Sequence, residues 1–492
     1  MKRFAISIIG LFVGLSSVLA QVPVKWQKTY GEGLYNSGSG IIQTEDGGYV
    51  ILSNSGSEVG NTKIHLVKID TLGIIQWERI VNNTDLKWAS DFKQTSDKGF
   101  IITGSVYSNI GRSYDLLLIK TDSAGNTEWE KEVGGASWDF GQTVLITPDS
   151  AFLSIGKTYS YGAGDADVYI VKTNFAGDTL WTRTFGGDSL DFGTSGDIAP
   201  DSNYMIAANT RSFGHGDQDA WILKLNTDGD TLWSCFYGDT LEDCVNSFRT
   251  TPDKGFVFVG YTRSYGAQLT ETWLMRYDSN YNYIWKLPEF WNIGPGEDVA
   301  NCVTLNDSAQ YVISGYTTGA GHGGREMFVA IIGDINFYKY GNTFGTPENE
   351  EATMAFQTRD KGYLISGYTA GFGPSNTNVY VIKTGSNAVT EGTCDYTVGT
   401  DEPASDLPID IMVYPNPTSD FLNVQLNPSV IAGTLQIILY DISGRALQIP
   451  SINGSPSSGQ FSVDLRSLKS GLYFMDMRCN GKRWTTRVIL QH

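Results

Sequence analysis

Two sets of loop carboxylates recur along the sequence at a spacing that could do chemistry. One set stands ten residues after each of three tryptophans, and the other closes the loops "YGAGDADVY" and "FGHGDQDAW". The sets are Asp139, Asp191 and Asp243, and Asp165, Asp167, Asp217 and Asp219. Clustered carboxylates suit Ca²⁺, which takes about 6–8 oxygen ligands. Turn capping, in which Asp accepts hydrogen bonds from backbone N–H groups, is the favoured alternative.

Both interpretations stay open at the level of sequence, and with them two classes of function. A polysaccharide hydrolase or lyase would use a pair of these carboxylates as acid and base or nucleophile. Their equal recurrence favours a non-enzymatic module that binds a protein or glycan, because an active site usually breaks the symmetry of a repeat. A calcium-stabilised surface protein is the third alternative. No other cofactor is expected.

The other reactive residues form no recognisable motif. The four histidines (His65, His215, His322 and His492) lie outside any HExxH pattern, and no GxSxG, P-loop or dinucleotide-binding glycine set is present. The five cysteines (Cys235, Cys244, Cys302, Cys394 and Cys479) include no CxxC pair. Cys235 and Cys244 are nine residues apart and could bridge neighbouring strands.

Aromatic residues fall in or near the same loops as the carboxylates. They are Phe140, Phe192, Tyr161, Phe213, Tyr265 and Phe372. Exposed aromatic rings suit sugar or peptide binding. Because these positions recur with the repeat, packing within the repeat's own core is the favoured interpretation.

A repeat of about 52 residues positions all of these side chains. Tryptophans stand at 26, 77, 129, 181, 233 and 285, and Tyr338 is the next equivalent, which gives seven units ending near Thr384. Each unit contains four short runs of β-branched and aromatic residues separated by turn residues. Joints such as "TSDKGF" predict hairpins in which Asp and Gly provide capping and positive φ.

Four antiparallel strands per unit, repeated at this period, predict the blades of a β-propeller. We therefore expect an all-β fold, a seven-bladed β-propeller with four-stranded blades over residues 21–386. Each tryptophan strand pairs with the preceding unit, so the run from Val24 to Gly31 is left over. It should complete the last blade and remove an exposed edge. The tryptophans should pack between blades.

The units resemble a known group of repeats. "DVYIVKTNFAGDTLWTRTFGGDSLDFG" and "DAWILKLNTDGDTLWSCFYGD" are similar to bacterial β-propeller (SBBP-like) repeats. The resemblance extends from Gln21 to about Thr384. It implies the propeller fold and no single function, because propellers host unrelated activities.

A different pattern follows a polar linker at 387–408. Residues 409–492 alternate apolar and polar positions and predict a small Ig-like β-sandwich. This region resembles the C-terminal sorting domain of the type IX secretion pathway of Bacteroidetes-type bacteria, and an ordinary Ig-like appendage is the alternative. The motif residues are Tyr414, Pro415, Asn416, Pro417, Gly444, Gly471, Tyr473 and Arg487. In that family the last strand more often reads K-[LIV]-[LIV], from which Arg487 and Val488 depart.

The chain ends and the net charge indicate a cellular address. Residues 1–20 have the basic start, apolar run and small residues of a secretory signal peptide, and no later segment is apolar enough to span a membrane. The net charge of −18 disfavours nucleic acid as a partner. The resemblance adds the type IX machinery as a partner. We expect a secreted or outer-surface protein.

Overall fold

The computed structural model describes two separate parts of the chain. They span residues 24–385 and 411–490, apart from short segments at 32–34, 57–61, 82–85, 109–112, 266, 268, 285–289, 292–295, 321–322, 334–339, 374, 415–420, 427–435, 442–445, 448–450, 456–459, 470 and 480–481. The chain divides into two compact units, Met1–Cys394 and Asp395–His492. The predicted signal peptide, Trp285, Tyr338 and the whole predicted linker lie outside the described residues.

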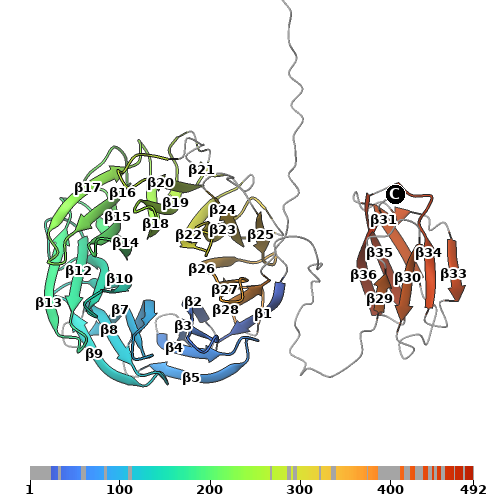
Figure 1. Cartoon of the computed structure of the whole chain (residues 1–492), viewed down its shortest axis with the longest axis horizontal. Helices are drawn as coiled ribbons and strands as arrows, with labels where there is room; N and C mark the ends of the chain where they lie inside the picture. The colour runs from blue at the N-terminus through green and yellow to red at the C-terminus, as the bar shows by residue number, and fades with distance from the viewer. Residues whose placement is uncertain are drawn as a thin grey trace, which may run out of the picture. The chain divides into compact units, whose positions relative to one another are not determined.

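The first unit is a ring of seven four-stranded antiparallel sheets, which confirms the predicted propeller (Figure 1). In each blade the first strand lies nearest the centre and the fourth forms the rim. Blades 1 to 3 consist of β2 (Tyr35–Gln43), β3 (Tyr49–Gly56), β4 (Thr62–Ile69), β5 (Ile75–Val81); β6 (Lys87–Gln94), β7 (Phe100–Ser108), β8 (Ser113–Thr121), β9 (Thr127–Val133); and β10 (Asp139–Ile146), β11 (Phe152–Thr158), β12 (Asp167–Thr173), β13 (Thr179–Phe185).

The remaining blades continue in the same order around the ring. Blades 4 to 6 consist of β14 (Asp191–Ile198), β15 (Tyr204–Thr210), β16 (Asp219–Leu225), β17 (Thr231–Tyr237); β18 (Asp243–Thr250), β19 (Phe256–Thr262), β20 (Glu271–Tyr277), β21 (Phe290–Trp291); and β22 (Asp298–Leu305), β23 (Tyr311–Thr317), β24 (Glu326–Ile332), β25 (Tyr340–Phe344). Blade 7 consists of β26 (Glu350–Gln357), β27 (Tyr363–Thr369), β28 (Asn378–Thr384) and β1 (Val24–Tyr30).

The hydrophobic core lies between blades. The two middle strands of a blade are buried on both faces, as in β11 and β12, whereas the rim strand β13 alternates between exposed and half-buried positions. One cluster joins Ile155 and Ile170 of blade 3 to Ile206 and Leu223 of blade 4. The run of apolar residues in a middle strand therefore reflects a neighbour on each side.

The repeated tryptophans pack between blades, as predicted. A Cβ added to Gly177, in the rim hairpin of blade 3, would lie 2.9 Å from the ring of Trp129 on the rim strand of blade 2. Gly177 also has a φ of 83°, so a side chain would be strained there as well. The same contact joins Trp77 to Gly125 and Trp181 to Gly229.

The hairpins between second and third strands share a polar device. In blade 3, Thr147 donates to the Asp149 carboxylate, and the buried Lys172 ammonium donates to it at 2.9 Å. Burial opposes ionisation of Asp149, but these hydrogen bonds outweigh it and lower its pKa. The equivalent pairs are Lys68–Asp46, Lys120–Asp97, Lys224–Asp201, Arg276–Asp253 and Lys383–Asp360.

The predicted role of glycine in these hairpins is only partly right. The position with positive φ holds Gly47 in blade 1, but Lys98 and Ser150 take it at 70° and 61° in blades 2 and 3. The glycine that follows allows a close approach instead. A Cβ at Gly99 would lie 2.0 Å from the carbonyl oxygen of Thr121.

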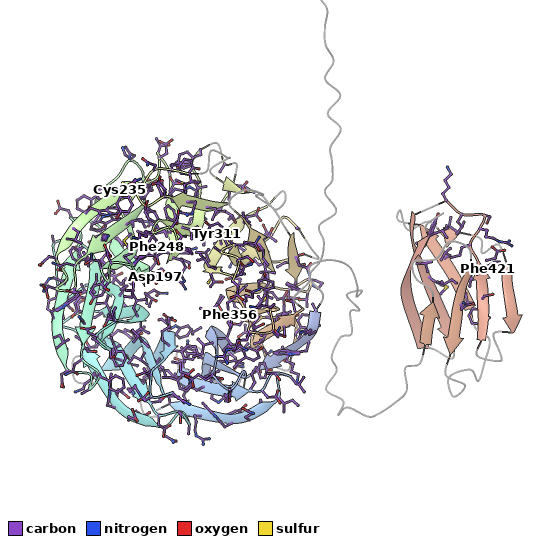
Figure 2. All side chains as sticks on the ribbon, viewed as in Figure 1. Asp197, Cys235, Phe248, Tyr311, Phe356 and Phe421 are labelled. Atoms are coloured by element: carbon purple, nitrogen blue, oxygen red, sulfur yellow. The ribbon has the colours of Figure 1, made fainter. Side chains whose placement is uncertain are left out.

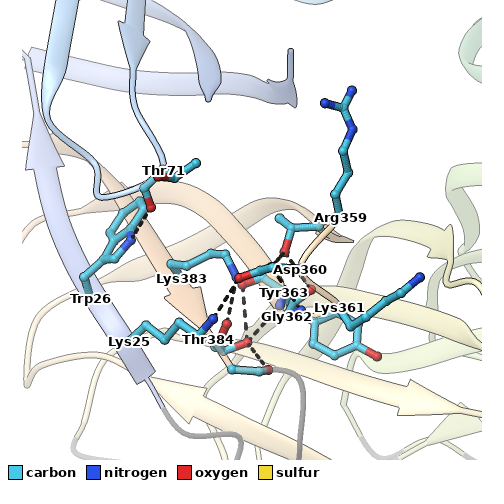
Figure 3. A network of polar contacts seen from close by, with 12 residues as sticks. Lys25, Trp26, Thr71, Arg359, Asp360, Lys361, Gly362, Tyr363, Lys383 and Thr384 are labelled. Carbon is cyan, nitrogen blue, oxygen red and sulfur yellow. Dashed lines mark hydrogen bonds and ion pairs between the residues drawn. The ribbon is translucent and has the colours of Figure 1, made fainter. Parts of the chain in front are cut away.

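The first strand closes the ring, as predicted. β1 pairs antiparallel with β28, and Lys25 and Lys383 donate to the two oxygens of Asp360 at 2.8 and 2.9 Å (Figure 3). The indole N–H of Trp26 donates to the carbonyl oxygen of Thr71 in blade 1 at 3.1 Å (Figure 3). The start of the chain thus ties the last blade to the first.

The second unit contains two four-stranded sheets that share one core, as expected for a β-sandwich. Leu422, Val463, Met475 and Val488 are buried together in it. The sheets are β29 (Ile411–Tyr414), β30 (Phe421–Leu426), β34 (Gln460–Asp464), β33 (Ser451–Ser455) and β32 (Ala446–Leu447), β31 (Gln436–Asp441), β35 (Gly471–Cys479), β36 (Lys482–Leu490).

Replacing Asp360 by Asn should weaken the ring closure. Lys383, whose side chain is 2% exposed, would keep its charge without an ionised partner. We expect a loss of about 1–2 kcal/mol in the free energy of unfolding, less than the ~3–5 kcal/mol of a fully buried pair, because the Asp360 side chain is 46% exposed. Urea unfolding at neutral pH measures it. In the control Asp178→Asn, which removes an exposed contact, the loss should be much smaller; equal losses would contradict the role of Asp360.

Candidate functional site

Most of the predicted loop carboxylates are buried between blades. Asp139, Asp167, Asp191, Asp219 and Asp243 have relative exposures of 0–1%. Each caps a loop: Asp191 accepts from the Gly187 N–H at 2.8 Å, and Asp167 accepts from the Ala163 N–H at 3.0 Å. Only Asp165 and Asp217 are exposed to a ligand in solution.

The carboxylates come together in twos and not as one open site. Asp167 and Asp191 both border Gly186, and Asp219 and Asp243 both border Gly238. The two members of each pair therefore lie side by side. Within the described residues, no three His, Cys, Asp or Glu side chains gather closely enough to hold a metal ion. The arrangement is that of loop caps facing one another across a blade interface.

The predicted bridge between Cys235 and Cys244 is wrong, because both thiols are free. Cys235 lies on the rim strand β17, and Cys244 lies on β18 at the centre of the next blade. The chain crosses from the rim to the centre between them, so nearness in sequence does not make them neighbours. Burial raises the pKa of Cys244 to about 12, and its sulfur accepts from the Gln218 amide at 2.7 Å.

A cavity of about 790 Å³ at the centre of the ring is the best candidate site. The first strands of all seven blades line it, and Asp197 lies beside the opening (Figure 2). A volume of this size suits a small molecule or a segment of a chain. The lining mixes polar groups with a few aromatic rings.

A ring of bulge residues supplies most of the polar lining. Each first strand loses register with the second at one residue, and that extra residue lines the cavity. These residues are Ser39, Ser90, Gln142, Thr194, Asn246, Asn301 and Thr353. Several tie neighbouring blades: Asn246 and Asn301 each donate at 3.0 Å to a carbonyl oxygen of the next blade.

The two carboxylates that line the cavity are already engaged by neighbouring blades. Asp91 accepts from the hydroxyl of Thr143 and the N–H of Val144 in blade 3 at 2.7 and 3.1 Å, and it also pairs with Lys93 of its own strand at 2.7 Å. Asp197 accepts from the hydroxyl and the N–H of Thr250 at 2.8 and 2.9 Å. These contacts favour a structural role for both carboxylates over acid and base catalysis.

Aromatic rings gather at one side of the cavity mouth. Tyr107, Tyr114, Trp138, Phe140 and Tyr159 form this aromatic crescent, with ring centroids 5.3–6.5 Å apart in successive pairs. Trp138 is 51% exposed and Tyr159 is 36% exposed. Phe140 also lines the cavity, so the crescent continues into it.

The crescent has a cation at its centre and further rings beside it. The Lys157 ammonium lies 5.3 Å from the ring of Phe140, 5.5 Å from Tyr159 and 5.9 Å from Phe192. Trp88 and Phe192 hold the position of Phe140 in blades 2 and 4 and line the cavity on either side of it. Trp88 is 44% exposed. Blades 2 to 4 thus present a nearly continuous aromatic surface.

The other side of the mouth is charged at the same positions. Arg211 and Arg263 replace Tyr159, as the repeated hydrogen bond from this residue to the preceding loop shows. Arg263 pairs with Glu242 at 2.9 Å, and Arg325 pairs with Glu351. The mouth therefore departs from the symmetry of the repeat.

The predicted aromatic residues divide into two groups. Tyr161, Phe213, Tyr265 and Phe372 pack on Tyr169, Trp221, Trp273 and Tyr380, which agrees with packing inside the repeat, but Tyr161 and Phe213 stay 46% and 40% exposed. Phe140 and Phe192 line the cavity. Trp88, Trp138, Tyr159 and the ring of bulge residues were not identified from the sequence. Aromatic residues stand at these three positions in only some of the seven units, so a position-by-position comparison of the units would have found them.

The predicted sorting residues are only partly described. Tyr414 ends β29, and Gly471 and Tyr473 lie on β35, where the Tyr473 hydroxyl donates to the Lys469 carbonyl oxygen at 2.7 Å. Arg487 lies on β36 opposite Phe474. Pro415, Asn416, Pro417 and Gly444 lie outside the described residues.

Comparison with known families identifies the end of the chain. Residues 412–491 match the family described as "Secretion system C-terminal sorting domain". No curated protein matches the sequence. The sorting-domain resemblance is thereby confirmed, whereas the SBBP-like resemblance of the propeller units stays a prediction. The described part of the chain has no helix with the length and hydropathy needed to cross a bilayer.

Similar solved structures are distant. The WD40 domain of Pan2 from Neurospora crassa is 11% identical with a TM-score of 0.43, over 70% of this chain and 89% of that chain. The β-propeller domain of the Trilobed protease from Pyrococcus furiosus is 10% identical with a TM-score of 0.43, over 72% and 94%. At these TM-scores, neither structure supports an argument about function. The propeller fold is established by the seven four-stranded sheets of this chain itself.

Proposed function

We propose that this protein is an exported, secreted or surface-attached module that binds a carbohydrate chain at the aromatic crescent. The single observation that carries the proposal is the break in symmetry at the cavity mouth. Blades 2 and 3 place exposed aromatic rings where blades 5 to 7 place ion pairs. Repeat-wide positions maintain the ring, so a departure limited to neighbouring blades requires another reason.

Carbohydrate is the ligand class that this surface fits best. Sugar rings pack their C–H faces on flat aromatic rings, and Trp138 and Tyr159 offer such faces with a large exposed fraction. Sugar hydroxyls also need donors and acceptors, which Gln142 and the other bulge residues provide in the adjoining cavity. A wholly apolar partner would leave these polar groups without hydrogen bonds.

Export is the second part of the proposal. The match at residues 412–491 supports handling by the type IX secretion machinery. Residues 1–20 would serve as the signal peptide for the first membrane, and residues 387–408 as a linker that frees the propeller from the sorting domain. We also propose that the propeller units are SBBP-like repeats of a Bacteroidetes-type bacterium.

The binding proposal predicts a loss of affinity when the crescent is truncated. A glycan array probed with the full chain identifies a ligand, and titration calorimetry then measures the dissociation constant. Trp138→Ala should raise this constant about tenfold, which corresponds to ~1.4 kcal/mol. Phe175→Ala, which removes an exposed ring from a rim hairpin, should leave it unchanged. No binding on the array, or equal effects of both variants, would overturn the carbohydrate assignment.

The export proposal predicts where a truncated chain accumulates. In a host with the type IX machinery, a chain ending at residue 386 should stay in the periplasm, because the sorting domain is missing. Its propeller should still fold, because all seven blades lie before that point. Fractionation with antibodies to the propeller measures this. Equal amounts of the full and truncated chains outside the cell would contradict a sorting role.

A further inference from the structure

Buried or half-buried carboxyl groups meet in pairs between neighbouring blades of the described part of the chain, and neither the fold nor the proposed binding uses their chemistry. Three pairs consist of aspartates: Asp115 with Asp139, Asp167 with Asp191, and Asp219 with Asp243. Glu326 and Glu350 border Gly345 in the same way. A Cβ at Gly186 would lie 1.9 Å from Asp167 Oδ1 and 2.8 Å from Asp191 Oδ2. The two carboxyl groups therefore border the same small volume.

One member of each pair is well provided with hydrogen-bond donors. Asp243 Oδ2 accepts from the Asp239 N–H at 2.8 Å and from the Ser264 hydroxyl at 2.7 Å, and Asp243 Oδ1 accepts from the Thr262 hydroxyl. Asp139 and Asp191 accept from the equivalent N–H and serine hydroxyl. Such donors stabilise the ionised form.

In both members, however, one oxygen lacks a hydrogen-bond partner among the described atoms: Asp139 Oδ1 and Asp191 Oδ1 as well as Asp115 Oδ1 and Asp219 Oδ1. The other oxygen of Asp219, Oδ2, accepts from the His215 N–H at 2.6 Å. Burial first, and the facing carboxylate second, raise the pKa of Asp115. Two ionised carboxylates side by side in a buried interface would be strongly unfavourable.

We propose that each of the three aspartate pairs holds one shared proton. Asp115, Asp167 and Asp219 are neutral carboxylic acids in the folded protein, and each donates its O–H to the carboxylate of Asp139, Asp191 or Asp243. The proton comes from solvent when the interface forms and returns there when it opens, so each closed pair carries a single negative charge.

The interface between blades 7 and 1 shows that a neutral pair fits this position. Asn378 and Asn36 stand there at the register of Asp167 and Asp139, and both are buried. Asparagine has the size of aspartic acid without its charge. A cation bound at this interface would have no negatively charged ligands from this pair. A neutral pair of side chains needs none.

A metal ion fits the pairs less well than a proton does. The oxygens of Asp167 and Asp191 already crowd the side of Gly186 where a Cβ would stand. No third His, Cys, Asp or Glu joins a pair within the part of the chain that is described. Two carboxyl groups alone fall short of the about 6–8 oxygens that Ca²⁺ takes.

Few other titratable groups face the pairs. Tyr169 lies near Asp115 and Asp139, and His215 lies near Asp219. Glu242 and Cys244 adjoin Asp243. Burial raises the pKa of Tyr169 and of Cys244, so neither group ionises between pH 4 and 8.

The proposal fixes the sign of the pH dependence. A carboxyl with a raised pKa binds more protons in the folded than in the unfolded state above its ordinary value of 3.8. Stability is therefore lost as the pH rises through the folded pKa. The hairpin carboxylates such as Asp149 have lowered pKa values, and their support is lost only as the pH falls below 3.8. The two effects occupy different pH ranges.

The test compares thermal unfolding of the full chain and of the triple variant Asp115→Asn, Asp167→Asn, Asp219→Asn between pH 4.5 and 8. The wild type should lose stability as the pH rises, and the variant should lose much less, with a melting temperature higher by about 1–2 °C at pH 8 for each kcal/mol relieved. The double variant Asp165→Asn, Asp217→Asn removes neighbouring exposed charges and should follow the wild type.

Two further measurements keep the proposal falsifiable if the triple variant folds poorly. Asn378→Asp creates a new acid at a neutral interface and should destabilise the chain more at pH 8 than at pH 5. Infrared spectra at pH 5 should show a protonated carboxyl band that the triple variant lacks. Parallel pH profiles of the wild type and the triple variant would overturn the shared proton. So would a melting temperature that falls with EDTA in the wild type alone, because it would assign a cation instead.

Discussion

The propeller depends on one constraint: each blade must bury both of its faces against its neighbours. The middle strands β11 and β12 have no solvent-exposed face, and the clusters that bury them combine side chains of two blades. A single blade would expose its apolar faces, so the ring gains most of its stability only on closing. This makes the pairing of β1 with β28 decisive, because it supplies the last rim strand and its contact with blade 1.

Close contact between blades explains the polar features as well. Ionisable groups at a blade interface leave water, so each needs a partner of its own. Lys172 meets Asp149 in a hairpin, and Asp191 meets N–H and hydroxyl donors of its loop. The acidic loop sets that first suggest a metal or catalytic site are thus products of packing. Their recurrence signals the architecture, and functional differences are found where the units diverge.

The sequence predicts the fold well and the candidate site poorly, for one physical reason. Blade number, strand order and the closing role of Val24 to Gly31 follow from periodic signals that every unit repeats. The crescent depends on single substitutions, such as Trp138 where later units have Leu190 and Glu242, and periodicity averages these away. The bulges at Gln142 and Asn246 depend on strand register, which the apolar pattern does not determine to one residue. The predicted Cys235–Cys244 bridge is wrong because the chain returns from the rim to the centre of the ring between the two residues. They are close in sequence, but Cys235 lies on the rim strand of one blade and Cys244 lies on the innermost strand of the next.

Geometry also explains why the cavity is polar whatever it binds. First strands converge at the centre of the ring, and in five blades the bulge brings the backbones so close that the facing strand has room only for glycine; Ser53 and Ala208 take this position in blades 1 and 4. A Cβ at Gly156 would lie 1.9 Å from the Phe140 carbonyl oxygen, and Gly260 and Gly315 meet the same limit. The bulge leaves ladder groups unpaired, and residues such as Asn246 satisfy a carbonyl of the next blade. Polar lining is therefore a cost of ring closure, and the aromatic crescent at the mouth is the feature that closure does not explain.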